Sequence, residues 1–313
     1  MFIQRPKSDF WQVGIIPAPA GRLLQSSAAL ADLAPRITWL PDAGPWRYLA
    51  DPFGLRRGEA THVFVEAFDY RDKHAVIEHH EFGPDLQWRG KSVALARPFH
   101  LSYPFLIEHG GEVFMVPESH QAGEIALYRA RNFPGDWIRE TVLLPNVRGA
   151  EASLIEHEGG WWMFYTVVGP GAQDQRELHI AFADRLTGPW HTHPLNPVLD
   201  DRAGARPGGT PFVGPDGCLI LPVQDCSRSY GGALRFLKFT RLDASGVRYE
   251  HLPLSLTGAL ASATHAEGLH TFSRCSDLTL IDVKAVSRSR ERQVLDFKRR
   301  LRRLQGRLGM ATG

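Results

Sequence analysis

The sequence predicts an all-β protein, a five-bladed β-propeller followed by a short, basic, amphipathic C-terminal helix. Two observations carry this prediction. Short apolar runs alternate with turns that contain Gly and Pro, which is typical of many short strands rather than of long helices. The same hairpin also returns roughly every 50 residues, a period that matches one four-stranded propeller blade.

The repeated unit has a small or polar entry, an apolar run, a Gly turn and a second apolar run. Its five copies are DPFGLRRGEATHVFVEAFD from Asp51, YPFLIEHGGEVFMVPES from Tyr103, EASLIEHEGGWWMFYTV from Glu151, TPFVGPDGCLILPVQDC from Thr210 and the weaker THAEGLHTFS from Thr264. The segments between these hairpins, such as EIALYRARNFPGDWIRETVLL, combine alternating apolar residues with turn residues. We expect them to form the outer two strands of each blade.

The repeat divides the chain into three parts. Residues 46–286 form the five-bladed propeller, and residues 287–313 form a basic helical tail. Residues 1–45 form an N-terminal segment, in which FWQVGIIPAP is expected to add a strand that closes the ring.

The tail is the most strongly charged part of the chain. Between Arg288 and Arg307 nine residues are basic and two are acidic, and apolar residues recur at helical spacing. This pattern predicts an amphipathic helix over residues 288–308. The helix could pack on the mildly acidic body, bind an anionic membrane surface such as the inner leaflet, or bind nucleic acid. We expect no nucleic-acid partner.

The bulk composition is that of a globular protein, with 43% apolar and 22% charged residues. The three cysteines form neither a metal-binding spacing nor an even disulfide set, which favours a reducing compartment. The start of the chain lacks the apolar region of a signal peptide, and no apolar run is long enough to span a membrane. We therefore expect a cytoplasmic protein, peripheral at the inner membrane if the tail binds lipid.

The hairpin ends supply the candidate site residues, because the inner strands of a propeller line its axis and their ends surround its mouth. A carboxylate at the end of an apolar run costs free energy of folding unless it is solvated, is paired with another group or takes part in function. Imidazole can carry a proton, and guanidinium can hold a phosphate with two hydrogen bonds. The expected catalytic residues are Asp51, Glu118 and Glu151, and the expected substrate-binding residues are Glu66, His100, Tyr103, Arg206, Gln224, Asp225 and His270.

No metal and no cofactor is expected. The EHHE run at Glu78–Glu81 resembles a metal cluster, but neighbouring side chains on a strand point to opposite faces. The expected partner is a sugar or glycan, activated by a nucleotide or a phosphate.

Several stretches resemble a known family. The pieces YLADPFG, HLSYPFLIEHGGEVFMVPES, ARPGGTPF and QDCSRSYGGAL resemble the N-terminal propeller domain of plant glucosamine inositolphosphorylceramide transferases and of its bacterial relatives. In the plant proteins a separate glycosyltransferase domain follows the propeller. More distantly, ADPF resembles the five-bladed furanosidases, the arabinanases and invertases. That resemblance implies Asp51 as base or nucleophile and Glu151 as the group that tunes it, whereas GGTPF carries no carboxylate where the acid would be.

These observations predict a carbohydrate-active protein. We favour an enzyme that makes or breaks a glycosidic bond, by glycosyl transfer, in the biosynthesis of a surface glycan or glycolipid. The first alternative is a non-catalytic sugar-binding propeller that presents a glycan to a partner transferase. The second is a furanosidase-like glycoside hydrolase. The sequence leaves the sugar, the acceptor and the general acid open.

Overall fold

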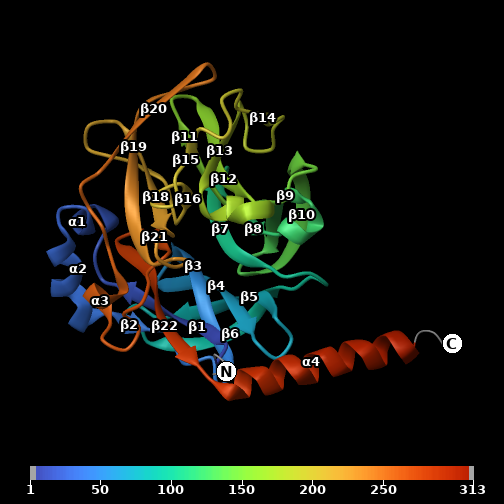
Figure 1. Cartoon of the computed structure of the whole chain (residues 1–313). Helices are drawn as coiled ribbons and strands as arrows, with labels where there is room; N and C mark the ends of the chain where they lie inside the picture. Colours follow the sequence, from blue (N-terminus) through green and yellow to red (C-terminus); the bar gives the residue numbers. More distant parts are fainter. Residues whose placement is uncertain (1–4, 310–313) are drawn as a thin grey trace.

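The computed structural model describes residues 5–309, with side chains described to residue 302, and it contains five antiparallel sheets around a central axis (Figure 1). The prediction of an all-β, five-bladed propeller with a C-terminal helix is confirmed. In each sheet a short hairpin lies at the axis and the other strands follow outward.

Blades one and two are regular four-stranded meanders, in which each strand pairs with the next in sequence. Blade one consists of β3 (Arg47–Arg57), β4 (Ala60–Asp69), β5 (His74–Phe82) and β6 (Trp88–Leu95). Blade two consists of β7 (Ser102–His109), β8 (Glu112–Glu118), β9 (Glu124–Asn132) and β10 (Gly135–Pro145), with the 3₁₀ helix η2 (His120–Ala122) after β8.

Blades three and four each contain a split strand. Blade three begins with β11 (Gly149–His157), β12 (Gly160–Val167) and β13 (Glu177–Ala183), and the 3₁₀ helix η3 (Pro170–Gln175) precedes β13. Two short strands, β14 (His191–Thr192) and β15 (Leu199–Asp200), then both pair with β13. In blade four, β16 (Arg206–Pro207) and β17 (Phe212–Val213) both pair with β18 (Leu219–Asp225), and β19 (Ala233–Asp243) and β20 (Gly246–His251) complete the sheet.

Blade five is assembled from both ends of the propeller. β21 (Phe272–Cys275) and β22 (Leu278–Arg288) come last in the sequence, whereas β1 (Lys7–Ile16) and β2 (Thr38–Trp39) come first. β1 pairs with β22 in an antiparallel register that runs from Lys7 opposite Arg288 to Ile16 opposite Thr279. Short helices lie beside this blade: α1 (Ala20–Leu23), α2 (Ser27–Leu33), η1 (Ala34–Arg36) and α3 (Gly258–Ala261).

The hydrophobic core is divided among the blade interfaces. Five apolar clusters of described residues join neighbouring sheets, as Phe64 of blade one and Trp137 of blade two do in one of them. The run Trp161–Tyr165, which is buried in blade three, contributes to two of these clusters. Because burial between sheets supplies the apolar stabilisation, the axis is left for polar groups.

Three inner strands carry the same backbone irregularity at the axis. Asp51, Tyr103 and Glu151 have positive φ angles of 51°, 45° and 54°, and each lies where the pairing register of its strand shifts. Positive φ is uncommon outside glycine, and a bulge redirects the side chain that it carries. In blade four Gly209, with φ 142°, adopts the positive φ. The fold therefore positions these side chains by one repeated device.

The helix α4 (Arg290–Gly309) follows β22 almost directly and extends past the edge of the propeller (Figure 1). Within residues 5–309, none of the helices combines the length and the apolar composition that a transmembrane span requires.

Candidate active site

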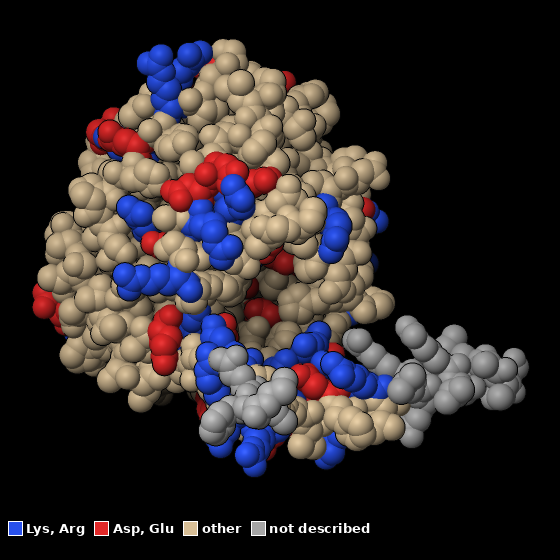
Figure 2. Space-filling view, in the orientation of Figure 1, with Lys and Arg blue, Asp and Glu red and all other residues tan. Residues whose placement is uncertain are grey.

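Carboxyl groups from four blades gather at the axis. They are Asp51, Glu66, Glu118, Glu151 and Asp282, and each of these residues is at most 8% exposed. Blade four contributes the buried Arg206. The propeller face in Figure 2 is hollowed at its centre, with acidic side chains inside the hollow and basic side chains around it. So many buried carboxyl groups beside one guanidinium cannot all be ionised.

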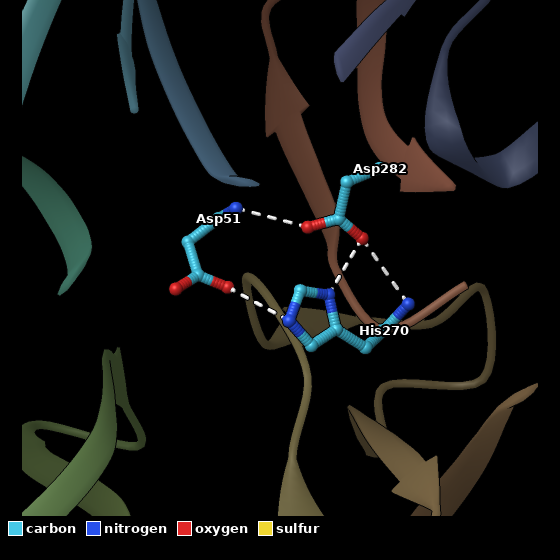
Figure 3. A group of neighbouring side chains, drawn as sticks. All are labelled: Asp51, His270 and Asp282. Carbon is cyan, nitrogen blue, oxygen red and sulfur yellow. Dashed lines mark hydrogen bonds and ion pairs between the residues drawn. The ribbon is translucent and has the colours of Figure 1, made fainter. Parts of the chain in front are cut away.

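The innermost part of the site is a chain of three side chains, Asp282, His270 and Asp51 (Figure 3). The Asp282 carboxylate accepts hydrogen bonds from the backbone N–H groups of Asp51, His270 and Thr271 at 2.9, 3.2 and 3.0 Å. It also lies 2.7 Å from His270 Nδ1, which therefore carries a proton. His270 Nε2 lies 3.4 Å from Asp51 Oδ1. The His270 ring thus lies between the two carboxylates, with one ring nitrogen facing each of them.

The surrounding side chains hold this chain in place. Trp11 of β1 stacks on the His270 ring, with centroids 3.7 Å apart and planes 12° apart. The Thr271 hydroxyl donates to Asp51 Oδ1 at 3.1 Å, and the Tyr103 N–H donates to Asp51 Oδ2 at 3.2 Å. Asp51 is therefore oriented by blades two and five while its own backbone belongs to blade one.

A buried ion pair forms the second part of the site. Arg206 Nη2 donates to Glu151 Oε1 at 2.6 Å and lies 3.9 Å from Glu118 Oε2, while Arg206 Nη1 contacts the carboxylate of Asp174 at 3.3 Å. The Arg206 guanidinium lies over the Tyr230 ring, 5.2 Å from its centroid. Among the described side chains, Glu151 Oε2 and Arg206 Nε are buried without a hydrogen-bond partner. The guanidinium charge is thus already shared among protein carboxylates.

The remaining two carboxyl groups each have a histidine neighbour. His120 Nδ1 lies 2.8 Å from Glu118 Oε1, and His100 Nε2 lies 3.3 Å from Glu66 Oε1. Both histidines are partly exposed, and both glutamates lie on the second strand of their blade, Glu118 at its end and Glu66 three residues before its end. Glu66 and Glu118 are the members of the cluster that are most accessible from the hollow.

The environments push the pKa values of these groups apart. Burial raises the pKa of Asp51 to about 6, with His270 opposing and Asp282 adding to the shift. Burial also raises the pKa values of Glu66 and Glu151 well above their usual range, and the Asp51 carboxyl adds to both shifts. Burial acts in the same direction on Glu118, but His120 and Arg206 outweigh it and hold its pKa below the usual value. The cluster therefore combines carboxyl groups whose protonated form is favoured with one whose ionised form is favoured.

The raised pKa of Asp51 predicts a stability that depends on pH. A folded-state pKa above the unfolded value stabilises the fold at low pH, and this contribution is lost as the pH rises through about 6. We expect Asp51→Asn to gain stability over the wild type by about 2 kcal/mol between pH 4 and pH 8. Urea unfolding of both proteins across this range measures the difference.

Asp277→Asn is the matched control for this measurement. A hydrogen bond from Arg56 lowers the pKa of the Asp277 carboxyl, which is 63% exposed, so its contribution has the opposite sign. A stability difference between Asp51→Asn and the wild type that does not change with pH would contradict a buried Asp51 carboxyl with a raised pKa.

Three candidates from the sequence are held by contacts within the protein. The fully buried Tyr103 hydroxyl lies 2.8 Å from Ser153 Oγ and accepts from the Gly209 N–H at 2.6 Å. The Gln224 amide donates to the Pro207 carbonyl at 2.9 Å, and the Asp225 carboxylate accepts from the Ser227 N–H at 2.9 Å. The Tyr103 hydroxyl connects blades, the Gln224 amide links two strands of blade four, and the Asp225 carboxylate orders a turn. The other seven candidates belong to the carboxyl cluster or contact it.

The Tyr103 hydroxyl joins blades two, three and four. Tyr103→Phe removes it and leaves the buried Ser153 hydroxyl and Gly209 N–H without this partner. We expect a loss of about 1–3 kcal/mol in the free energy of unfolding. Urea denaturation tests this value, with Tyr249→Phe on the half-exposed surface of β20 as the control. An equal loss in the two variants would count against a bridging role.

The sequence did not identify Asp282, Trp11, His120 or Tyr230 as members of the site. A signal existed for Asp282, which interrupts the apolar run TLIDV in the strand that became β22. The contribution of Trp11 depends on β1 joining blade five, which brings a residue from the start of the chain against His270.

Asp51, His270 and Asp282 also offer ligand atoms within 4.8 Å of one another, as a metal site would. However, the Asp282 oxygens already accept three backbone N–H groups and the His270 ring N–H. The Asp282 carboxylate is thus already satisfied by hydrogen bonds within the protein.

Comparison with known proteins gives the family. Residues 37–274 match the family described as glucosamine inositolphosphorylceramide transferase 1, N-terminal. The chain belongs to this family. Glucosamine inositolphosphorylceramide transferase 1 of Oryza sativa subsp. indica is 32% identical over 216 residues, which cover 68% of this chain and 28% of the relative. The same enzyme of Arabidopsis thaliana is 29% identical over 274 residues, 79% of this chain and 34% of the relative. The chain thus spans about a third of these relatives.

Solved structures share the fold at low identity. A family 117 glycoside hydrolase of Zobellia galactanivorans has a TM-score of 0.54 at 15% identity, covering 78% of this chain and 86% of that one. An α-L-arabinofuranosidase of Podospora anserina has a TM-score of 0.55 at 12% identity, covering 76% and 90%. These similarities establish a common five-bladed architecture.

Proposed function

We propose that this propeller is an enzyme that makes or breaks a glycosidic bond by general acid and base catalysis at the axial carboxyl cluster. The observation that carries the proposal is the divergence of pKa values within one hollow. Carboxyl groups whose pKa values are shifted in opposite directions can accept one proton and donate another in the same reaction.

Asp51 is the general base. Its carboxylate is available above about pH 6, and it faces His270, whose ring is held by Asp282. Asp51 removes the proton from an incoming hydroxyl or water as that oxygen bonds to the anomeric carbon. Glu66 then donates its proton to the leaving oxygen as the glycosidic bond breaks, since burial keeps this carboxyl protonated.

The other two carboxyl groups support this reaction. Glu118 remains ionised and faces the positive charge that develops on the sugar ring. Arg206, which donates a hydrogen bond to Glu151, lowers the pKa of Asp51 and so opposes the effect of burial.

A neighbouring cavity offers space for a sugar. This cavity of about 560 Å³ lies between blades five and one, and its lining includes the aromatic residues Trp11, Trp46 and Tyr48. Tyr48 lies near Glu66 of the carboxyl cluster. Burial and this neighbouring carboxyl group raise the pKa of the Tyr48 hydroxyl. Aromatic faces beside polar groups suit the apolar face and the hydroxyls of a sugar.

Glycosyl transfer is the form of the reaction that we favour, because the relatives of this family are named as transferases. A donor activated by a nucleotide or phosphate would meet the basic side chains around the hollow rather than Arg206, whose charge is already paired. Hydrolysis is the alternative with the same residues, in which water replaces the acceptor hydroxyl.

A second function is a sugar-binding module that presents a glycan to a separate transferase. One observation favours it, namely that the matched region is a third or less of the curated relatives. Such a module would bind its glycan but would not turn it over.

One screen separates the two functions. The wild type is incubated with nucleotide sugars, each with sugar acceptors, and with aryl glycosides, and products are detected by mass spectrometry. Product formation that Asp51→Asn abolishes supports the enzyme. Glycan binding of equal strength in both proteins, without product, would favour the binding module and reject the proposed catalysis.

A further inference from the structure

The helix α4 is amphipathic, but its apolar stripe points away from the propeller. Val294, Phe297 and Leu301 follow one another at helical spacing and are 51%, 63% and 40% exposed. A helix that is packed on a globular body normally buries such a stripe against it. Phe297 is therefore a large aromatic side chain left to solvent on an ordered helix.

The face that meets the propeller is charged instead. Arg292 is buried, lies over the Tyr70 ring at 4.2 Å from its centroid and contacts Ser8 Oγ at 3.2 Å. Arg299 donates to the Tyr70 carbonyl at 3.3 Å and pairs with Asp296 at 2.7 Å. These polar contacts fix the rotation of the helix, so the outward direction of the apolar stripe is built into the fold.

Basic residues border the apolar stripe. Lys298 and Arg300 are exposed, and Arg302 is also exposed although it donates to the Arg71 carbonyl and pairs with Asp72 of the propeller. The sequence adds Arg303 and Arg307, while Leu304 and Leu308 continue the apolar spacing. An exposed apolar stripe flanked by a strong excess of positive charge complements a surface that is negatively charged outside and apolar beneath.

We propose that α4 docks the protein on an anionic lipid bilayer, with Val294, Phe297 and Leu301 inserted among the acyl chains and the Lys and Arg side chains on the headgroups. The start of the helix lies near Tyr48, because the Tyr70 ring under the Arg292 guanidinium contacts the Tyr48 ring at 5.9 Å between centroids. Docking through α4 therefore holds the hollow close to the membrane surface. The proposal does not depend on the catalytic role of the carboxyl cluster, since docking can be measured without a sugar.

The test is co-sedimentation of the full chain with vesicles of phosphatidylcholine alone or with phosphatidylserine added. We expect binding only to the anionic vesicles and a steep loss of binding as salt rises. Phe297→Ser combined with Leu301→Ser should weaken binding more than tenfold. Lys298→Gln combined with Arg300→Gln should weaken it roughly thirtyfold at low salt, about fivefold per charge.

The matched controls lie on blades three and four of the propeller. Leu195→Ser removes an apolar side chain that is 52% exposed, and Arg248→Gln removes an exposed charge on β20, so neither should alter vesicle binding. All four substituted positions of α4 are exposed, so these variants are expected to fold, as circular dichroism can verify.

Three results would overturn the proposal. The first is equal binding to neutral and anionic vesicles, or no binding to either. The second is a dimer in sedimentation velocity that Phe297→Ser dissociates, which would assign the stripe to a second copy of the chain. The third is binding to a single-stranded oligonucleotide that requires Lys298 and Arg300 while anionic vesicles are not bound.

Discussion

Asp51→Asn is expected to lower turnover by about 10²- to 10⁴-fold, the usual contribution of a general base. The amide keeps the size of the carboxylate and can still accept one hydrogen bond from Thr271 or Tyr103, so the loss would reflect missing basicity. Steady-state rates on the substrate found in the screen measure the effect. The wild-type rate should rise with pH through about 6, as Asp51 loses its proton, and fall at higher pH as Glu66 loses its own.

The same substitution has opposite effects on stability and on activity. Asp51→Asn should be the more stable protein at pH 8, so a loss of activity cannot be ascribed to unfolding. Asp277→Asn, which changes an exposed carboxylate on the same blade as His270, should keep the wild-type rate. Equal rates for Asp51→Asn and the wild type would remove Asp51 from the mechanism.

Gly209→Ala is expected to cost about 3 kcal/mol or more of the free energy of unfolding, the largest effect on stability that we predict. A Cβ atom at this position would lie 1.9 Å from the Phe272 carbonyl oxygen, which belongs to the backbone of blade five. Gly209 also bridges to Phe272 and binds the Tyr103 hydroxyl, so blades four and five and the axis would all have to move. Urea unfolding, or the yield of folded protein, measures the loss.

Gly217→Ala separates the steric effect from the effect of positive φ. Gly217 lies in a turn of the same blade with φ 82°, and a Cβ atom there would meet no other atom within 4 Å. The control should lose only the roughly 1–2 kcal/mol of a left-handed residue. Equal losses in the two variants would show that close packing at Gly209 is unimportant.

The sequence could predict what is repeated in the chain. The Gly turns and the Pro that follows Asp51 and Tyr103 recur with the blade, so they locate the inner strands and the residues at their entrances. Asp51, Glu118 and Glu151 were found in this way, and the structure places all three at the axis.

Contacts that depend on closure of the ring could not be predicted. The His270 and Asp282 pair faces Asp51 only because blade five lies next to blade one, and Trp11 reaches it from the opposite end of the chain. Likewise, periodicity predicted the helix α4 but not its rotation, which is set by Arg292 and Tyr70. Such contacts leave no period in the sequence, since each one occurs once.

The shared blade five cannot be completed until its last strand has been synthesised. β1 leaves the ribosome before the other strands of the propeller, but its partner β22 follows only after blades one to four have been translated. At about 5–20 residues per second, this delay is on the order of 15–50 seconds. One edge of β1 stays unpaired during this time and could pair with another nascent chain. Chaperones that shield nascent strands would therefore matter more for this protein than for one whose first strand pairs with its neighbour in sequence.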